Sequence, residues 1–170
     1  MNFIEFVKNR YSCKNFSDKK VEKEKLDIIL EAGRLAPTAK NNQIQRIYVV
    51  KSNDALIKID ELTPCRYNAP LVLLVAFDES EAFVYPGGKY NTGVEDATIV
   101  ASHMVLAASS LDVDSCWVNL FDPDKASEKF SLPENEKVLA MIDLGYANDG
   151  VGPLENHFKK KDLDETVKFI

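Results

Sequence analysis

Two cations and a hydroxyl stand within five residues near the start of the chain, at Arg10, Ser12 and Lys14. They follow an amphipathic segment, residues 3–7, that predicts a short first helix. A guanidinium, an ammonium and a hydroxyl are the donors that a phosphate dianion needs, and arginine adds a bidentate fork. A basic helix end would look the same, because cations there stabilise the last carbonyl groups. The turn alone therefore leaves a phosphate site and a helix end as alternatives.

Bulk properties narrow the class of protein. The 170 residues, 45% apolar and 28% charged, predict one globular domain spanning residues 1–170. A net charge of −6 argues against partners such as nucleic acid or an anionic membrane surface. No apolar run approaches the roughly 18 residues that span a bilayer. The start of the chain, with Glu5 and no long apolar region, predicts no secretory signal.

The cysteines and histidines predict neither disulfides nor a metal site. Cys13, Cys65 and Cys116 are odd in number and widely spaced, which fits reduced thiols in a cytoplasmic protein. Only two histidines are present, and no CxxC pair. We therefore expect a cytoplasmic protein without a bound metal.

The order of expected elements predicts an α+β fold. Strands are expected at residues 47–50, 71–77, 116–121 and 138–144, with helices at residues 53–63 and from Pro123. A helix capped by Ser17 or Asp18 should carry an apolar stripe and end before Pro37. A long helix over residues 92–111, rich in alanine and serine, should be the most buried helix and a candidate subunit interface. The sequence has no Gly-rich turn between an expected strand and an expected helix. It therefore predicts neither a dinucleotide-binding fingerprint nor a P-loop.

Four segments in the same order resemble the FMN-dependent nitroreductase family, and the resemblance covers most of the chain. Residues 10–16, RYSCKNF, match the family's Arg-x-Ser-x-Arg/Lys-x-Phe turn, and residues 36–43, APTAKNNQ, match its Ala-Pro-Ser-x-x-Asn-x-Gln loop. The helix over residues 96–111 resembles the family's long central helix. Residues 144–146, LGY, and the basic-then-acidic tail over residues 159–165 match its C-terminal part.

The resemblance implies a nitroreductase-like α+β fold. This fold would have a mostly antiparallel or mixed sheet of about four strands, flanked by helices, and a long central helix. Two chains would form an intertwined homodimer that binds FMN at the subunit interface. Arg10, Ser12 and Lys14 would hold the phosphate and ribityl chain, and Lys160 or Lys161 would add a cation. Thr38, Ala39 and Asn41 would reach the partner's cofactor, and Trp117, Val118 and Asn119 would lie along the ring. The full expected cofactor-binding set is Arg10, Tyr11, Ser12, Lys14, Pro37, Thr38, Ala39, Asn41, Arg66, Cys116, Trp117, Val118, Asn119, Lys160 and Lys161.

Several of these residues have simpler alternatives. Trp117 and Cys116 could be core side chains, and Asn41 could be a turn residue that tolerates a left-handed backbone. The lysine run at residues 159–161 could simply be solvated, whereas Arg66 could balance charge near flavin N1. Tyr85 and Tyr90 are candidates for the mouth of a substrate site.

The resemblance also implies an activity. Such an enzyme passes electrons from NADH or NADPH to nitroaromatic, quinone or flavin acceptors in a ping-pong cycle, and the chemistry at flavin N5 needs no dedicated catalytic side chain. Two alternatives stay open: a related flavin enzyme with another reaction, and a non-catalytic flavin-binding dimer. The sequence departs from the family at Ile44-Gln45, where Pro-Trp is usual, at residues 112–114, DVD, and in the tail, where lysines replace an arginine.

Overall fold

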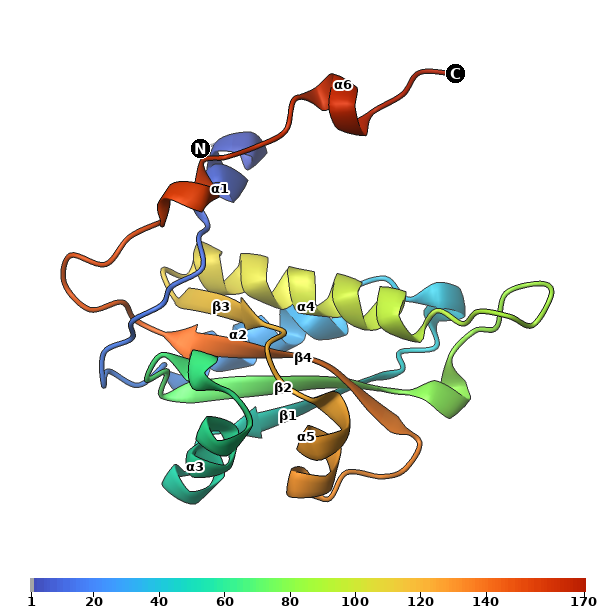
Figure 1. Ribbon diagram of the computed structural model, residues 1–170, viewed down its shortest axis with the longest axis horizontal. Helices are drawn as coiled ribbons and strands as arrows, with labels where there is room; N and C mark the ends of the chain where they lie inside the picture. Colours follow the sequence, from blue (N-terminus) through green and yellow to red (C-terminus); the bar gives the residue numbers. More distant parts are fainter. Residues whose placement is uncertain (1) are drawn as a thin grey trace.

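A four-stranded sheet lies at the centre of the computed structural model, which describes residues 2–170 (Figure 1). Its strands are β1 (Gln45–Val50), β2 (Leu71–Asp78), β3 (Asp114–Val118) and β4 (Glu136–Gly145). They are arranged in the order β1-β2-β4-β3, and each neighbouring pair is antiparallel. The expected α+β fold with about four strands is confirmed.

Helices cover both faces of this sheet (Figure 1). The helices α2 (Lys23–Arg34) and α4 (Gly93–Ser110) lie on one face, and α3 (Asn53–Leu62) and α5 (Pro123–Phe130) lie on the other. Alternate residues of β2 supply the two cores: Leu71, Leu73, Val75 and Phe77 pack on the first face, and Val72, Leu74 and Ala76 on the second. Burial on both faces explains why β2 is an unbroken apolar run.

The small residues of α4 permit close packing. The helix occupies the predicted range, with Thr92 and Leu111 as its caps. A Cβ at Gly93 would lie 2.3 Å from the Phe77 ring, so only glycine fits where the first turn of α4 meets the end of β2. Gly33 of α2 makes similar room for Met104.

Two predicted boundaries were wrong. The helix α2 begins at Lys23, well after Ser17 and Asp18. Ser17 instead donates its N–H and hydroxyl to the Tyr146 carbonyl, which keeps the chain extended there. The strand β3 spans Asp114–Val118, so it begins two residues before the predicted Cys116 and ends three residues before the predicted Phe121. Asp114 is accommodated because its carboxylate accepts a hydrogen bond from the Ala147 N–H at 2.8 Å.

The two ends of the chain lie together outside the sheet and its covering helices (Figure 1). They comprise α1 (Phe3–Asn9) and a tail that contains the 3-10 turn η4 (Glu155–His157) and α6 (Leu163–Thr166). The His157 Nε2 atom lies 2.9 Å from the Lys8 carbonyl oxygen and joins the tail to α1. None of the helices within residues 2–170 has the length and apolar character needed to cross a membrane.

Candidate functional site

The basic turn after α1 is fixed against the sheet. Ser12 pairs with Ser115 of β3 in a parallel bridge, and the Cys13 N–H donates to the Ser115 carbonyl at 2.9 Å. Phe16 is buried, and its N–H donates to the Tyr67 carbonyl at 3.0 Å. Backbone pairing therefore holds the turn along the edge of β3.

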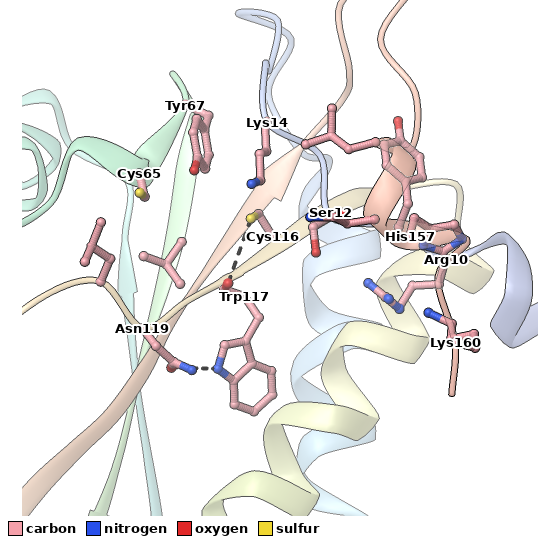
Figure 2. A pocket seen from close by; sticks show the side chains of 15 residues that line it. Arg10, Ser12, Lys14, Cys65, Tyr67, Cys116, Trp117, Asn119, His157 and Lys160 are labelled. Carbon is pink, nitrogen blue, oxygen red and sulfur yellow. Dashed lines mark hydrogen bonds between the residues drawn. The ribbon is translucent and has the colours of Figure 1, made fainter. Parts of the chain in front are cut away.

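A cavity of about 390 Å³ opens between this turn, the end of β3 and the tail (Figure 2). Its volume lies within the range of small-molecule and cofactor sites. Nine of the residues expected from the sequence line it: Arg10, Tyr11, Ser12, Lys14, Cys116, Trp117, Val118, Asn119 and Lys160. Segments distant in the sequence thus meet at one site.

The cations of this cavity lack carboxylate partners. Within residues 2–170, no Asp or Glu oxygen lies within 4.0 Å of the charged atoms of Arg10, Lys14 or Lys160. Figure 2 shows Arg10 and Lys160 on one side of the cavity and Tyr67 on the opposite side, with Ser12 and Lys14 between them. Uncompensated cations beside a hydroxyl form a site suited to an anion.

The remainder of the wall is largely aromatic and aliphatic. Trp117 is held by a hydrogen bond from its indole Nε1 to the Asn119 Oδ1 atom at 2.9 Å. Tyr67 reaches the cavity from a turn in which Tyr67 and Asn68 adopt left-handed backbone angles, with φ of 52° and 64°. A hydrogen bond with Cys65 and burial raise the pKa of Tyr67 to about 12, so it is a neutral phenol at ordinary pH. These groups suit a flat, mostly apolar ligand.

Two buried thiols are not activated: Cys116, which lines the cavity, and Cys13, which lies in the basic turn. Burial raises the pKa of Cys116 to about 12, and the charge of Asp143 acts in the same direction. Burial also raises the pKa of Cys13. Since the thiolate is the reactive form, neither group is a nucleophile near neutral pH. Within residues 2–170, no three His, Cys, Asp or Glu side chains gather in a way that could hold a metal ion.

Sequence reasoning missed six residues that line the cavity. They are Cys65, Tyr67, Leu120, Leu154, Asn156 and His157. Leu154, Asn156 and His157 stand within six residues of Lys160, so the predicted lysine could have led to them. No local sequence pattern indicates that Cys65 and Tyr67 line the cavity. Cys65 lies in the 3-10 helix η2 (Pro64–Arg66), and Tyr67 lies in the left-handed turn that follows it.

The loop over residues 37–43 does not reach this cavity within one chain. The Ala39 N–H donates to Asp96 in the first turn of α4 at 2.9 Å, whereas Arg10 and Tyr11 border a hollow with Ser109 at the other end of α4. At 1.5 Å per residue, Asp96 and Ser109 lie about 20 Å apart along the helix. Pro37, Thr38, Ala39 and Asn41 therefore belong to the opposite end of the molecule.

This loop has a strained and well-tied backbone. Lys40 and Asn41, in the 3-10 turn η1 (Ala39–Asn41), have φ of 52° and 57°, so Asn41 is in the left-handed turn conformation that its side chain tolerates. The Thr38 hydroxyl oxygen accepts from the Gln43 N–H at 3.0 Å. Tyr85 lies near the same end of α4, where its hydroxyl donates to Glu95 at 2.6 Å, and Tyr90 is exposed.

Two other expected ligands are not among the residues that line the cavity. Arg66 donates twice to the Asp60 carboxylate, at 2.6 and 2.7 Å, and once to the Ala69 carbonyl. It borders a different hollow, together with Asp60. Lys161 also lies outside the lining, and Lys160 is the lysine of the run that faces the cavity.

The sequence matches a family model described as the nitroreductase family over residues 7–65 and 62–146. The chain belongs to the nitroreductase family. A relative from Methanothermobacter thermautotrophicus, provisionally named NADH dehydrogenase/NAD(P)H nitroreductase, is 30% identical over 89% of this chain and 81% of its own length.

Solved structures agree with this membership. A nitroreductase family protein from Clostridium difficile 630 superposes with a TM-score of 0.93 at 38% identity, covering 99% of this chain and 98% of its own. An FMN-dependent nitroreductase from Clostridium difficile R20291 gives 0.80 at 28% identity, covering 98% of each chain.

The departures from the family pattern have structural roles here. Ile44 is fully buried in the core beneath α2 and α4, and Gln45 begins β1. Asp112 has a φ of 55° in the turn between α4 and β3, and Asp is one of the residues that tolerate this conformation. Each replacement is thus compatible with the family fold.

Proposed function

We propose that this chain is an FMN-dependent oxidoreductase that binds the cofactor in the cavity beside the basic turn. The observation that carries the proposal is the convergence of Arg10, Lys14 and Lys160, free of carboxylate partners within residues 2–170, at a cavity whose remaining wall includes several aromatic and aliphatic side chains. A dianionic phosphate needs the first feature, and a flat ring needs the second. The donor set therefore fits FMN.

The residues divide the work of binding. Arg10, Ser12 and Lys160 would hold the phosphate by charge-assisted hydrogen bonds. Trp117 and Val118 would lie along the ring, and the Trp117–Asn119 hydrogen bond would fix the orientation of the indole. Lys14 would offset negative charge that builds up on the ring. When bound, FMN supplies the two-electron transfer, so no nucleophile or dedicated base is required of the protein.

The electron donor and acceptor are inferred from the family. Relatives named NAD(P)H nitroreductase support NADH or NADPH as the donor, and a structural neighbour at 28% identity is called FMN-dependent. We infer a ping-pong cycle, in which the nicotinamide leaves before a nitroaromatic, quinone or flavin acceptor enters. The electron donor and the electron acceptor would then occupy the same cavity one after the other.

A homodimer would complete the site. The loop with Thr38 and Asn41 lies about 20 Å along α4 from the cavity of its own chain, so a second copy must supply it if it touches the cofactor. The helix α1 and the C-terminal tail also expose apolar side chains that a partner would cover: Phe3, Ile4, Phe158, Leu163, Val167, Phe169 and Ile170. We propose that these segments wrap a second copy.

Cofactor loading and turnover test the proposed function. Purified protein incubated with FMN and desalted should retain flavin absorbance, which NADH or NADPH bleaches anaerobically and a nitroaromatic restores. If the protein retains flavin but neither nicotinamide reduces it, the reductase hypothesis is wrong. A related flavin enzyme or a non-catalytic flavin-binding dimer is then favoured. Protein that retains no flavin would remove every cofactor assignment made above.

Light scattering during size exclusion tests the dimer. The wild-type chain should elute with twice the 19.1 kDa mass of one chain. Phe169→Glu should shift the population toward monomer, because a charge would be buried at the contact. Ile57→Glu, an exposed apolar position on α3, serves as the matched control and should stay dimeric. A wild-type monomer would refute the assembly.

A further inference from the structure

A buried carboxyl group without a partner lies inside the sheet at Asp143. The residue interrupts the apolar run of β4 and is 1% exposed. Both of its carboxyl oxygens are buried, and neither has a hydrogen-bond partner within residues 2–170. Buried carboxyl groups are ordinarily hydrogen-bonded or paired, so this one needs an explanation.

Strand register places Asp143 next to a residue of the cavity floor. It is paired with Cys116 of β3 on one side and with Val72 of β2 on the other. Residues opposite each other on antiparallel strands point to the same face, with Cβ atoms about 4.5–5.5 Å apart. Since Cys116 lines the cavity, Asp143 lies beside that floor on the same face of the sheet, although it is not itself among the lining residues.

The neighbours of Asp143 do not neutralise an ionised form. The charged and titratable groups around it come from β3, the basic turn, α3 and the segment around η2: Cys116, Cys13, Asp60, Cys65, Arg66 and Tyr67. Arg66 is the one cation of this set, and its donors are taken up by Asp60 and Ala69. Burial therefore outweighs its attraction and raises the pKa of Asp143 to about 9.

We propose that Asp143 is a positioning residue for an anionic cofactor: its neutral acid form keeps the cavity floor uncharged, and its ionisation weakens the hold of the cavity on that cofactor. The inference rests on the proposed binding of FMN. Linkage fixes the sign, because an anion in the cavity favours the protonated acid, and the protonated acid must then favour the anion by the same factor.

FMN affinity as a function of pH tests this coupling. Dissociation constants would be measured by flavin fluorescence quenching between pH 7 and 9.5 for the wild type, Asp143→Asn and Asp78→Asn. The wild-type constant should rise about 2.5-fold across this range, because a fivefold coupling, near 1 kcal/mol, is only partly expressed half a pH unit above a pKa of about 9. The constant of Asp143→Asn should rise less than about 1.3-fold, once the rise that Asp78→Asn shares with it from the lysines and from FMN itself is allowed for.

The control variant removes a carboxyl group of similar burial from the far end of β2. Asp78 is 7% exposed and stands six residues from Val72, about 20 Å along the strand. Asp78→Asn should keep the wild-type pH profile. Parallel profiles for the wild type and Asp143→Asn would overturn the coupling while leaving the proposed function intact. Absence of FMN binding at every pH would overturn both.

A measurement on the wild type guards against a variant that fails to fold. The side-chain carboxyl carbon of Asp143 can be titrated by NMR with and without FMN. Its titration should move to higher pH by at least about 0.7 units in the complex, the equivalent of a fivefold coupling. An unchanged titration would overturn the proposal.

Discussion

Two sets of cations in this molecule contrast in their partners. On the body of the protein, Arg46 is within 4.0 Å of Asp78, Glu81 and Glu136, and Arg66 is paired with Asp60. Around the cavity, Arg10, Lys14 and Lys160 meet no carboxylate within residues 2–170. The first set is paired with acids, of which Asp78 and Glu136 are buried, whereas the second leaves positive charge available to a ligand. Pairing therefore distinguishes the structural cations from the cations that we propose bind FMN.

Replacing Arg10 should have the largest effect on the ligand. Arg10→Ala removes charged hydrogen bonds of about 2–3 kcal/mol and should weaken FMN binding about 30- to 150-fold, with little change in thermal unfolding. Titration calorimetry measures the loss. The matched control is Arg34→Ala, because Arg34 is exposed and already bonded to Glu31 at 2.6 Å. Equal affinities for the two variants would remove Arg10 from the site.

Replacing Arg46 should lower the stability of the fold without changing the affinity for FMN. Arg46→Ala leaves Asp78 and Glu136, both buried, without their cation and should lower the free energy of unfolding by about 2 kcal/mol. Urea denaturation measures this change. The affinity for FMN should stay within about twofold of the wild-type value, and a large loss of affinity would show that the two sets are not separate.

Lys160 should have a smaller effect than Arg10, because an ammonium lacks the bidentate fork. Lys160→Ala should weaken FMN binding about fivefold, near 1 kcal/mol, in the same calorimetric assay. Lys168→Ala is the control, since Lys168 lies in the tail and donates to the Asp164 carbonyl at 2.6 Å. If Lys168→Ala weakens binding as much, the tail acts through general charge rather than through Lys160.

Two buried acids should give opposite responses to pH. Hydrogen bonds from Ser80 lower the pKa of Asp78, so its contribution to stability is present above about pH 4 and is lost as pH falls further. Burial raises the pKa of Asp143 to about 9, so its contribution is present below about pH 4 and is lost as pH rises toward 9.

The apo-protein of Asp143→Asn should therefore lose that alkaline decline. Relative to the wild type, its Tm should rise by about 10–20 °C between pH 5 and pH 9, because a pKa of about 9 in the folded protein costs about 5 kcal/mol over this interval. Scanning fluorimetry at the two pH values checks this. A constant difference between the two proteins would mean that Asp143 does not titrate over this interval.

Much of the fold follows from patterns that repeat along the chain. Continuous apolar runs predicted β2 and β4, and helical periodicity predicted α4 nearly to the residue. The start of α2 was missed because Ser17 is tied to Tyr146, a contact across the fold that no local pattern reveals. Long-range backbone pairing there prevailed over an ordinary capping residue.

Some residues of the candidate site could likewise be predicted from the sequence, whereas others depend on long-range structure. The place of Arg10, Ser12 and Lys14 at the cavity could be predicted because the turn resembles the one in the nitroreductase family, although its spacing alone also fits a helix end. Tyr67 could not, since its place depends on a left-handed turn. Asp143 did carry a signal, an acid within an apolar strand, but its position beside Cys116 depends on strand register. Register is a property of the whole sheet.

The bridge between Ser12 and Ser115 has a consequence for the solubility of the protein. The strand β3 is the last of the sheet, and an uncovered edge strand presents free N–H and carbonyl groups to other molecules. The basic turn covers part of that edge through the hydrogen bond from Cys13 to Ser115. Detachment of the turn would remove its cations from the cavity and expose the backbone groups of β3 at the same time, so loss of the proposed FMN binding and aggregation should occur in the same event.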